Sequence, residues 1–347
     1  MTSLIPALMM IVGSYGAPND TTIHTYAFDT NTGTATELSS TTGVPNASFL
    51  TLVNDHTLLA VNENCDQTDA LTVLKGTAKE GFHPVASALT GGEAPCHVVL
   101  SPDGSYAVTA NYLGGSVSIF PLDREVRSLP QPVVVSFSGH GPRSPRQDTP
   151  HAHFTSFTPD GQFMVVDDLG TDRLHMFPLD DHGRPVVDDM FDIELQAGSG
   201  PRHLVYNEAG DRAYLVNELD GTVTVLAYET GRFVPLQSVP ADYAGGHASA
   251  DIHLSPDGRF LYSSNRIKGD GIVIFSVDEK SGRITEAGFM PTGSHPRNFA
   301  ITPDGNWLLV ACRDDNRIEV YRRHHDTGAL IPHTSIPCPK PVCILFQ

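Results

Sequence analysis

Several short motifs contain histidine, arginine and carboxylate side chains. The motif PHAHF carries His151 and His153, GPRHL carries Arg202, and the VNE that follows carries Glu218. Histidine and glutamate act as general acids or bases, and arginine stabilises a developing oxyanion or holds an anionic group through paired hydrogen bonds. These residues therefore indicate a small-molecule site that binds negative charge and moves protons.

A repeat of about fifty residues shows which elements must position these motifs. Each copy reads as a strand, a tight turn rich in Pro, Asp and Gly, and a second strand, followed by two further strand signals. The turn glycines lie 57, 49, 48 and 47 residues apart. They are Gly104, Gly161, Gly210, Gly258 and Gly305. Four strands in 40 to 50 residues is the period of a propeller blade.

The two ends of the chain complement each other. The segments MMIVGSYG, TIHTYAFD and TATELSS read as the second to fourth strands of a blade, and Val342–Phe346 reads as a first strand. Joining them closes the ring and removes the open edge. Six complete units and this composite predict an all-β protein: a single seven-bladed β-propeller domain over residues 1–347, closed by the N- and C-terminal strands.

Counting from the turn glycines predicts which residues meet at one rim. Arg202 and Glu218 each stand eight residues from Gly210, and the start of a first strand shares a face with the end of the second. The same register contains His153, Arg266, Arg297 and Arg313. One position inward are His97, His203, Asp251 and Asn298. We therefore expect a site at the mouth of the central channel, a usual place for a ligand.

With these motifs in view, the chain resembles the family of seven-bladed lactonases that includes the bacterial propeller-type 6-phosphogluconolactonase and the fungal 3-carboxy-cis,cis-muconate cycloisomerase. The matching stretches are GPRHLVYNEAGDRAYLVNE, ADIHLSPDGRFLYSSNR and HPRNFAITPDGNWLLVA. The resemblance implies a catalytic set of one His, two Arg and one Glu, which falls on His153, Arg202, Glu218 and Arg266. His151 is also available as the active histidine, but His153 shares the register of Arg202.

The resemblance implies hydrolysis of a sugar lactone, 6-phosphogluconolactone first of all. The loop 139–150 departs from the family pattern and adds arginines near the same rim. The expected substrate-binding residues are His97, Arg143, Arg146, His151, His203, Asp251, His253 and Arg297. Two alternatives stay open: a cycloisomerase acting on a carboxymuconate, and a non-catalytic propeller that binds proteins, because one fold can host many functions.

The amino-acid composition limits the kinds of partner that we expect the protein to bind. With 22 basic and 40 acidic residues the formal charge is −18, which disfavours nucleic-acid and anionic-membrane partners. Five cysteines without regular spacing suggest reduced thiols and a cytoplasmic location. The start Met1–Val12 reads as part of the fold rather than a leader. Since HAH offers two histidines without a third ligand, we expect no metal and no other cofactor. We also expect a monomer or weak homodimer.

Overall fold

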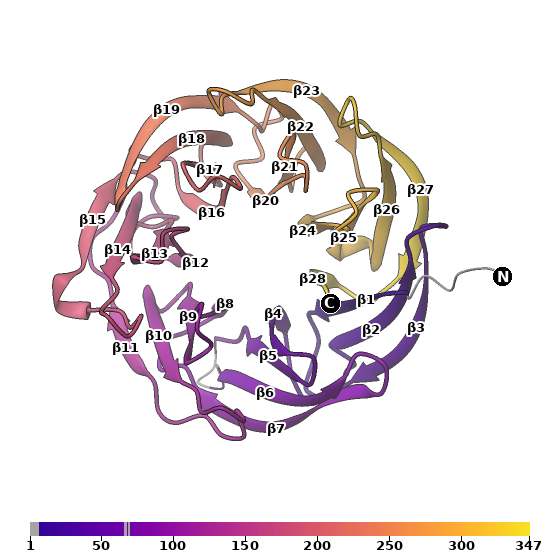
Figure 1. Ribbon diagram of the computed structural model, residues 1–347, viewed down its shortest axis with the longest axis horizontal. Coiled ribbons are helices and arrows are strands. Elements are labelled where there is room, and N and C mark those ends of the chain that lie inside the picture. Colours follow the sequence, from indigo (N-terminus) through magenta and orange to yellow (C-terminus); the bar gives the residue numbers. More distant parts are fainter. Residues whose placement is uncertain (1–6, 66–67, 69) are drawn as a thin grey trace.

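The computed structural model describes residues 7–347 except 66, 67 and 69, and it consists of seven four-stranded antiparallel sheets arranged as a ring (Figure 1). The first residues of the predicted N-terminal segment, 1–6, lie outside the described residues. Two short 3-10 turns, η1 (Val187–Asp189) and η2 (Arg313–Asp315), interrupt the strands. The predicted all-β, seven-bladed propeller is confirmed.

Six blades consist of four consecutive strands each, numbered from the central axis outward. Blade 1 consists of β4 (Ala47–Asn54), β5 (Thr57–Asn62), β6 (Ala70–Thr77) and β7 (Gly81–Leu89). Blade 2 consists of β8 (Pro95–Leu100), β9 (Tyr106–Asn111), β10 (Ser116–Pro121) and β11 (Val133–Ser136). Blade 3 consists of β12 (Ala152–Phe157), β13 (Phe163–Asp168), β14 (Arg173–Pro178) and β15 (Phe191–Glu194). Blade 4 consists of β16 (Pro201–Tyr206), β17 (Arg212–Asn217), β18 (Thr222–Glu229) and β19 (Arg232–Pro240). Blade 5 consists of β20 (Ser249–Leu254), β21 (Phe260–Asn265), β22 (Gly271–Val277) and β23 (Ile284–Pro291). Blade 6 consists of β24 (Pro296–Ile301), β25 (Trp307–Cys312), β26 (Arg317–Arg323) and β27 (Leu330–Pro337).

Blade 7 joins the two ends of the chain. Its innermost strand is β28 (Pro341–Phe346), followed outward by β1 (Leu8–Ser14), β2 (Ile23–Asp29) and β3 (Thr34–Thr41). β28 pairs antiparallel with β1, from Met10 opposite Phe346 to Gly13 opposite Cys343. The composite blade predicted from the orphan C-terminal strand is therefore confirmed, and it leaves no open strand edge between blades 6 and 1.

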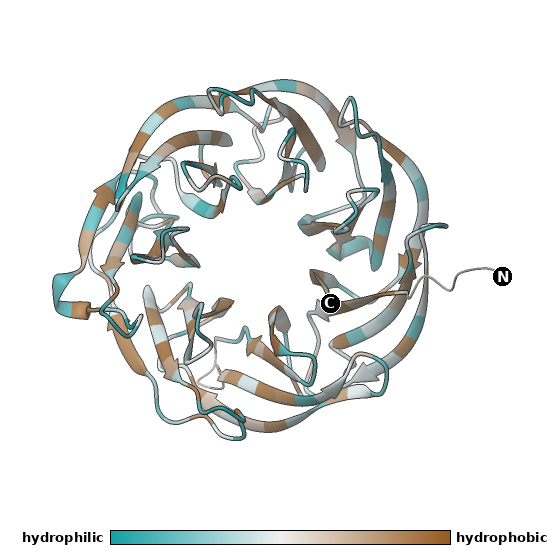
Figure 2. Ribbon diagram, in the orientation of Figure 1, coloured by the Kyte–Doolittle hydropathy of each residue, from teal (hydrophilic) through white to brown (hydrophobic). Residues whose placement is uncertain are grey.

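The hydrophobic core lies between the blades. Seven clusters of buried side chains fill the seven interfaces between neighbouring sheets. Between blades 6 and 7, the single tryptophan, Trp307, meets Phe28 edge to face, with ring centroids 6.3 Å apart. Apolar residues recur along every blade in Figure 2, whereas the outermost strands such as β3 and β11 are largely exposed. Packing between blades thus fixes the inner strands that carry the polar motifs.

Candidate active site

A local irregularity in the inner strands aims polar side chains at the channel mouth. In blades 2, 3, 4 and 6, the pairing of the first strand shifts register at its second residue. The residues at these shifts are Cys96, His153, Arg202 and Arg297. A bulge leaves such a residue outside the ladder and redirects its side chain. The eight-residue count from the turn glycines identified these positions.

Glu218 lies at the centre of the cluster and contacts three guanidinium groups. Its Oε2 accepts hydrogen bonds from Arg202 Nε at 2.9 Å and from Arg266 Nη2 at 3.1 Å. Its Oε1 accepts one from Arg146 Nη2 at 2.6 Å. Glu218 follows β17, Arg202 is in β16 of the same blade, Arg266 follows β21, and Arg146 comes from the loop 139–150. The structure thus brings together three of the four predicted catalytic residues and one predicted substrate-binding residue.

The charge state of Glu218 follows from this environment. Burial favours the neutral acid, but the positive charges of Arg266, Arg202 and Arg146 outweigh it and lower the pKa of Glu218 to about 2. Arg202 is itself fully buried and donates from Nη1 to the carbonyl oxygen of Ala250. At neutral pH the cluster therefore contains a carboxylate held by three cations.

His153, the fourth predicted catalytic residue, is buried beside this cluster and carries no charge. Burial and the guanidinium of Arg202 lower its pKa well below the usual range. Its Nδ1 has no hydrogen-bond partner among the described residues. Its ring centroid lies 5.1 Å from that of His203 and 5.6 Å from that of Tyr112. A buried imidazole nitrogen without a partner is unusual, since buried polar atoms are normally paired, and it marks His153 as a candidate for a ligand contact.

His151 has a different environment from His153. Its Nδ1 donates to the carbonyl oxygen of Tyr112 at 2.9 Å, and its ring stacks on the Tyr112 ring at 4.5 Å. Its backbone N–H donates to Asp168 Oδ1 at 2.6 Å. His151 precedes β12, and its Nδ1 and backbone N–H are engaged in these contacts, whereas the Nδ1 of His153 has no partner among the described residues.

The other half of the rim contains four residues that the motif comparison did not select. Glu63 Oε2 accepts a hydrogen bond from the Tyr15 hydroxyl at 2.9 Å and lies 3.4 Å from Arg297 Nη2. His295 has a φ of 59°. Its Nε2 lies 3.5 Å from Arg266 Nη1, and its Nδ1 lies 3.2 Å from Arg313 Nη2. The fourth of these rim residues is Tyr112, whose hydroxyl accepts a hydrogen bond from Arg146 Nη2. Glu63 follows AVN as Glu218 follows LVN, and this shared signal identifies it in retrospect.

A buried hydrogen-bond network lies one position inward, where the sequence placed it. Asp251 accepts hydrogen bonds from His203 Nδ1 at 2.8 Å, His253 Nε2 at 3.0 Å and Asn298 Nδ2 at 2.6 Å. Burial raises the pKa of Asp251, but the two imidazoles more than offset it and hold that pKa well below its usual range. His97 stands apart from this network: its Nδ1 accepts from the Thr155 N–H at 3.3 Å. The network joins blades 4, 5 and 6 beneath the rim.

The loop 139–150 is fixed by a buried glutamine. Gln147 donates from Nε2 to the carbonyl oxygen of Leu169 and to Asp172 Oδ1, both at 2.8 Å. Asp172 also accepts from the backbone N–H groups of Gly198 and of Gly200, the first residue of GPRHL. These contacts hold the loop in a position from which the Arg146 side chain reaches Glu218. Arg143, from the same loop, is exposed and lies against Gly198.

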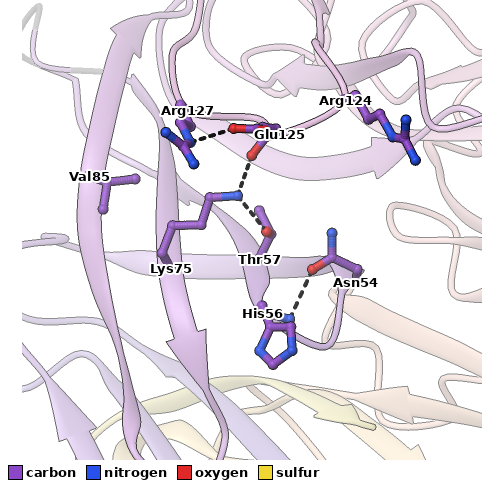
Figure 3. A pocket seen from close by; sticks show the side chains of 8 residues that line it. All are labelled: Asn54, His56, Thr57, Lys75, Val85, Arg124, Glu125 and Arg127. Atoms are coloured by element: carbon purple, nitrogen blue, oxygen red, sulfur yellow. Dashed lines mark hydrogen bonds and ion pairs between the residues drawn. The ribbon is translucent and has the colours of Figure 1, made fainter.

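A cavity of about 660 Å³ lies at the opposite end of blade 1, near the β4–β5 turn (Figure 3). Lys75, in its wall, donates to Thr57 Oγ1 at 2.7 Å, and Arg127 pairs with Glu125 at 2.7 Å. This cavity lacks the buried His, Arg and Glu combination of the rim, so we place the chemistry at the rim. In the part of the chain that the structure describes, no three or more His, Cys, Asp or Glu residues form a metal-binding group. No helix among those residues is long and apolar enough to cross a membrane.

Comparison with known proteins assigns the family. A family described as "Lactonase, 7-bladed beta-propeller" matches residues 9–346. The chain belongs to this lactonase family. A family member named 6-phosphogluconolactonase from Formosa agariphila is 36% identical over 331 residues, which cover 92% of this chain and 94% of the relative. The 6-phosphogluconolactonase of Bacillus subtilis is 30% identical over 345 residues, covering 96% and 97%.

A solved structure of the same architecture extends the comparison. The Pseudomonas aeruginosa periplasmic gluconolactonase PpgL matches this lactonase-family chain with a TM-score of 0.90 at 31% identity, covering 98% of each chain. The resemblance drawn from the SPDG turns and GPRHL is confirmed, as is the prediction of a lactonase-type enzyme. The similar proteins bear names that refer both to a phosphorylated and to an unphosphorylated lactone, so the choice between these substrates depends on the rim.

Proposed function

We propose that this protein hydrolyses 6-phosphogluconolactone to 6-phosphogluconate at the channel mouth. The observation that carries the proposal is the buried carboxylate of Glu218, ionised at neutral pH and held at 2.9 Å by Arg202 and 3.1 Å by Arg266, beside the unpartnered His153. The names of the Formosa and Bacillus relatives support the substrate class.

In the proposed reaction, Glu218 removes a proton while water attacks the lactone carbonyl. The water oxygen bonds to the carbonyl carbon, its proton passes to the Glu218 carboxylate, and the carbonyl electron pair forms an oxyanion. Arg202 and Arg266 are the cations that stabilise this oxyanion, because preorganised charges act strongly in a site shielded from water. The bond from the carbonyl carbon to the ring oxygen then breaks, and the ring oxygen takes up the proton, leaving a hydroxyl and a carboxylic acid that ionises.

His153 has a supporting role in this proposal. Its pKa lies well below neutral, so it is a weak base and a neutral hydrogen-bond partner. We assign its free Nδ1 to a substrate hydroxyl next to the lactone carbonyl. The inner network of His203, Asp251 and Asn298 then holds the strands that present Arg202 and Arg297.

A turnover assay tests the proposal. Purified protein is mixed with freshly made 6-phosphogluconolactone, unphosphorylated gluconolactone or 3-carboxymuconate, and acid release or isomerisation is followed against the spontaneous rate. We expect 6-phosphogluconolactone to be opened with the highest kcat/KM. A protein that isomerises the muconate and leaves both lactones untouched acts as the cycloisomerase instead.

The cytoplasmic location and the monomer or weak homodimer state stay predictions.

A further inference from the structure

The two carboxylate oxygens of Glu218 are held very differently. Oε2 contacts Arg202 and Arg266, whose side chains are 1% and 7% exposed. Within the described part of the chain, the hydrogen bond to Oε1 comes from Arg146, whose side chain is 44% exposed. Oε1 is therefore the oxygen that becomes free when a single, solvent-accessible side chain moves.

Arg146 can move without disturbing the fold. Its backbone belongs to a loop that the buried Gln147 ties to Leu169 and Asp172. Its side chain spans from this anchor to the rim, where Nη2 also donates to the Tyr112 hydroxyl at 3.1 Å. Swinging the side chain away leaves these anchoring contacts intact, and Glu218 keeps both buried arginines as counter-charges.

The proposed reaction needs such a movement. A general base works best when its pKa lies near the working pH, and three guanidiniums hold the pKa of Glu218 far below neutral. The hydrogen bond from Arg146 also takes up one of the two lone pairs of Oε1, so it competes with a water molecule for this oxygen. Free enzyme is thus held in a weakly basic, partly blocked state.

We propose that Arg146 is the receptor for the phosphate group of the substrate, and that its transfer from Glu218 Oε1 to that phosphate unblocks the base. This inference rests on the proposed function. A phosphate monoester carries up to two negative charges and three acceptor oxygens, and guanidinium binds it through two parallel bonds. It therefore competes well with a carboxylate that retains two other cations. An unphosphorylated lactone leaves Arg146 on Glu218 and reacts slowly.

Other charged groups face Glu218 and set the background against which Arg146 acts. Arg202 and Arg266 contact it directly, and Arg297 and Tyr112 lie close enough to interact electrostatically. Since these groups stay in place, loss of Arg146 removes one of several nearby cations. Glu218 then becomes a stronger base but remains ionised at neutral pH.

The test combines inorganic phosphate with an Arg146→Gln variant. Calorimetry measures phosphate binding to wild type, Arg146→Gln and the control Arg127→Gln, which removes an exposed arginine paired with Glu125 at the opposite end. Kinetics then measure gluconolactone hydrolysis with and without phosphate, and the kcat/KM ratio of the phosphorylated to the unphosphorylated lactone. Urea denaturation verifies that each variant is folded.

We expect Arg146→Gln to weaken phosphate binding by about tenfold or more, as loss of a charge-assisted hydrogen bond typically does. Phosphate should accelerate gluconolactone hydrolysis several-fold in wild type and in Arg127→Gln but not in Arg146→Gln, and the preference for the phosphorylated lactone should fall by about 10- to 100-fold.

Unchanged phosphate affinity and an unchanged lactone preference in Arg146→Gln would overturn the assignment. If wild type binds phosphate through Arg146 yet opens neither lactone, the proposed function fails and the anion-receptor role of Arg146 stands. If wild type opens both lactones but phosphate neither binds nor activates, the proposed function stands and the role of Arg146 fails.

Discussion

Replacing Glu218 by glutamine removes the central negative charge while keeping the size of the side chain. The ordinary pKa of this carboxyl is 4.5 and its pKa in the fold is about 2, a difference of about 2.5 units. At 1.36 kcal/mol per unit, the ionised group stabilises the fold at pH 7 by about 3 kcal/mol. Because the folded pKa is depressed, this stabilisation exists above pH 4.5 and is lost as the pH falls toward 2.

Urea denaturation of wild type and Glu218→Gln at pH 7, 5 and 3 measures this contribution. The variant leaves three guanidiniums facing one another without their carboxylate, so we expect it to be less stable by about 3 kcal/mol at pH 7. The difference should shrink to about 1 kcal/mol at pH 3, because a group with a pKa of about 2 is still largely ionised there. Its kcat on the preferred lactone should fall by about 10²–10⁴-fold. Glu125→Gln, at an exposed ion pair, is the matched control. Equal stability at pH 7, or a near-normal rate in the variant, would refute the reasoning.

Three further predictions follow from the same contacts. The imidazole of His175 bridges Asp168 at 3.1 Å and Asp192 at 2.6 Å. Burial lowers the pKa of His175, but these carboxylates raise it overall. Wild type should therefore lose stability against urea as the pH rises above 6.5, and His175→Gln should lack this dependence. Asp251→Asn should lower stability in urea by about 3 kcal/mol, because a buried carboxylate is lost from two imidazoles; a change below 1 kcal/mol would contradict the network. Deletion of residues 341–347 removes β28, so circular dichroism should show loss of cooperative thermal unfolding, and a normal transition would contradict the closure.

The sequence was sufficient to predict the architecture and the part of the site that follows the repeat. The turn glycines mark where the inner strands end, so counting eight residues back and eight residues forward from Gly210 located Arg202 and Glu218. The same count reached His153, because every blade repeats the shift in pairing near the start of its inner strand. It reached Arg266 because this residue, like Glu218, directly follows the second strand of its blade. The incomplete blade at each end of the chain likewise predicted the β28–β1 pairing.

Two of the missed residues, Glu63 and Tyr15, lie where the repeat is interrupted. Glu63 belongs to a blade whose turn is Asn-Asp-His without glycine, and Tyr15 belongs to the blade split between the two ends of the chain. The contact of Arg146 with Glu218 depends on a loop outside the repeat, whose path is set by the buried amide of Gln147. No strand register applies to such a loop, so only its proximity to the rim could be predicted from sequence.

The most direct test of the account is a comparison of kcat/KM for wild type and Glu218→Gln on 6-phosphogluconolactone, measured against the spontaneous hydrolysis rate. We expect efficient opening of this lactone by wild type and a loss of about 10²–10⁴-fold in the variant. A wild-type protein that does not accelerate the opening of 6-phosphogluconolactone, or a variant that opens it at the wild-type rate, would contradict the central claim.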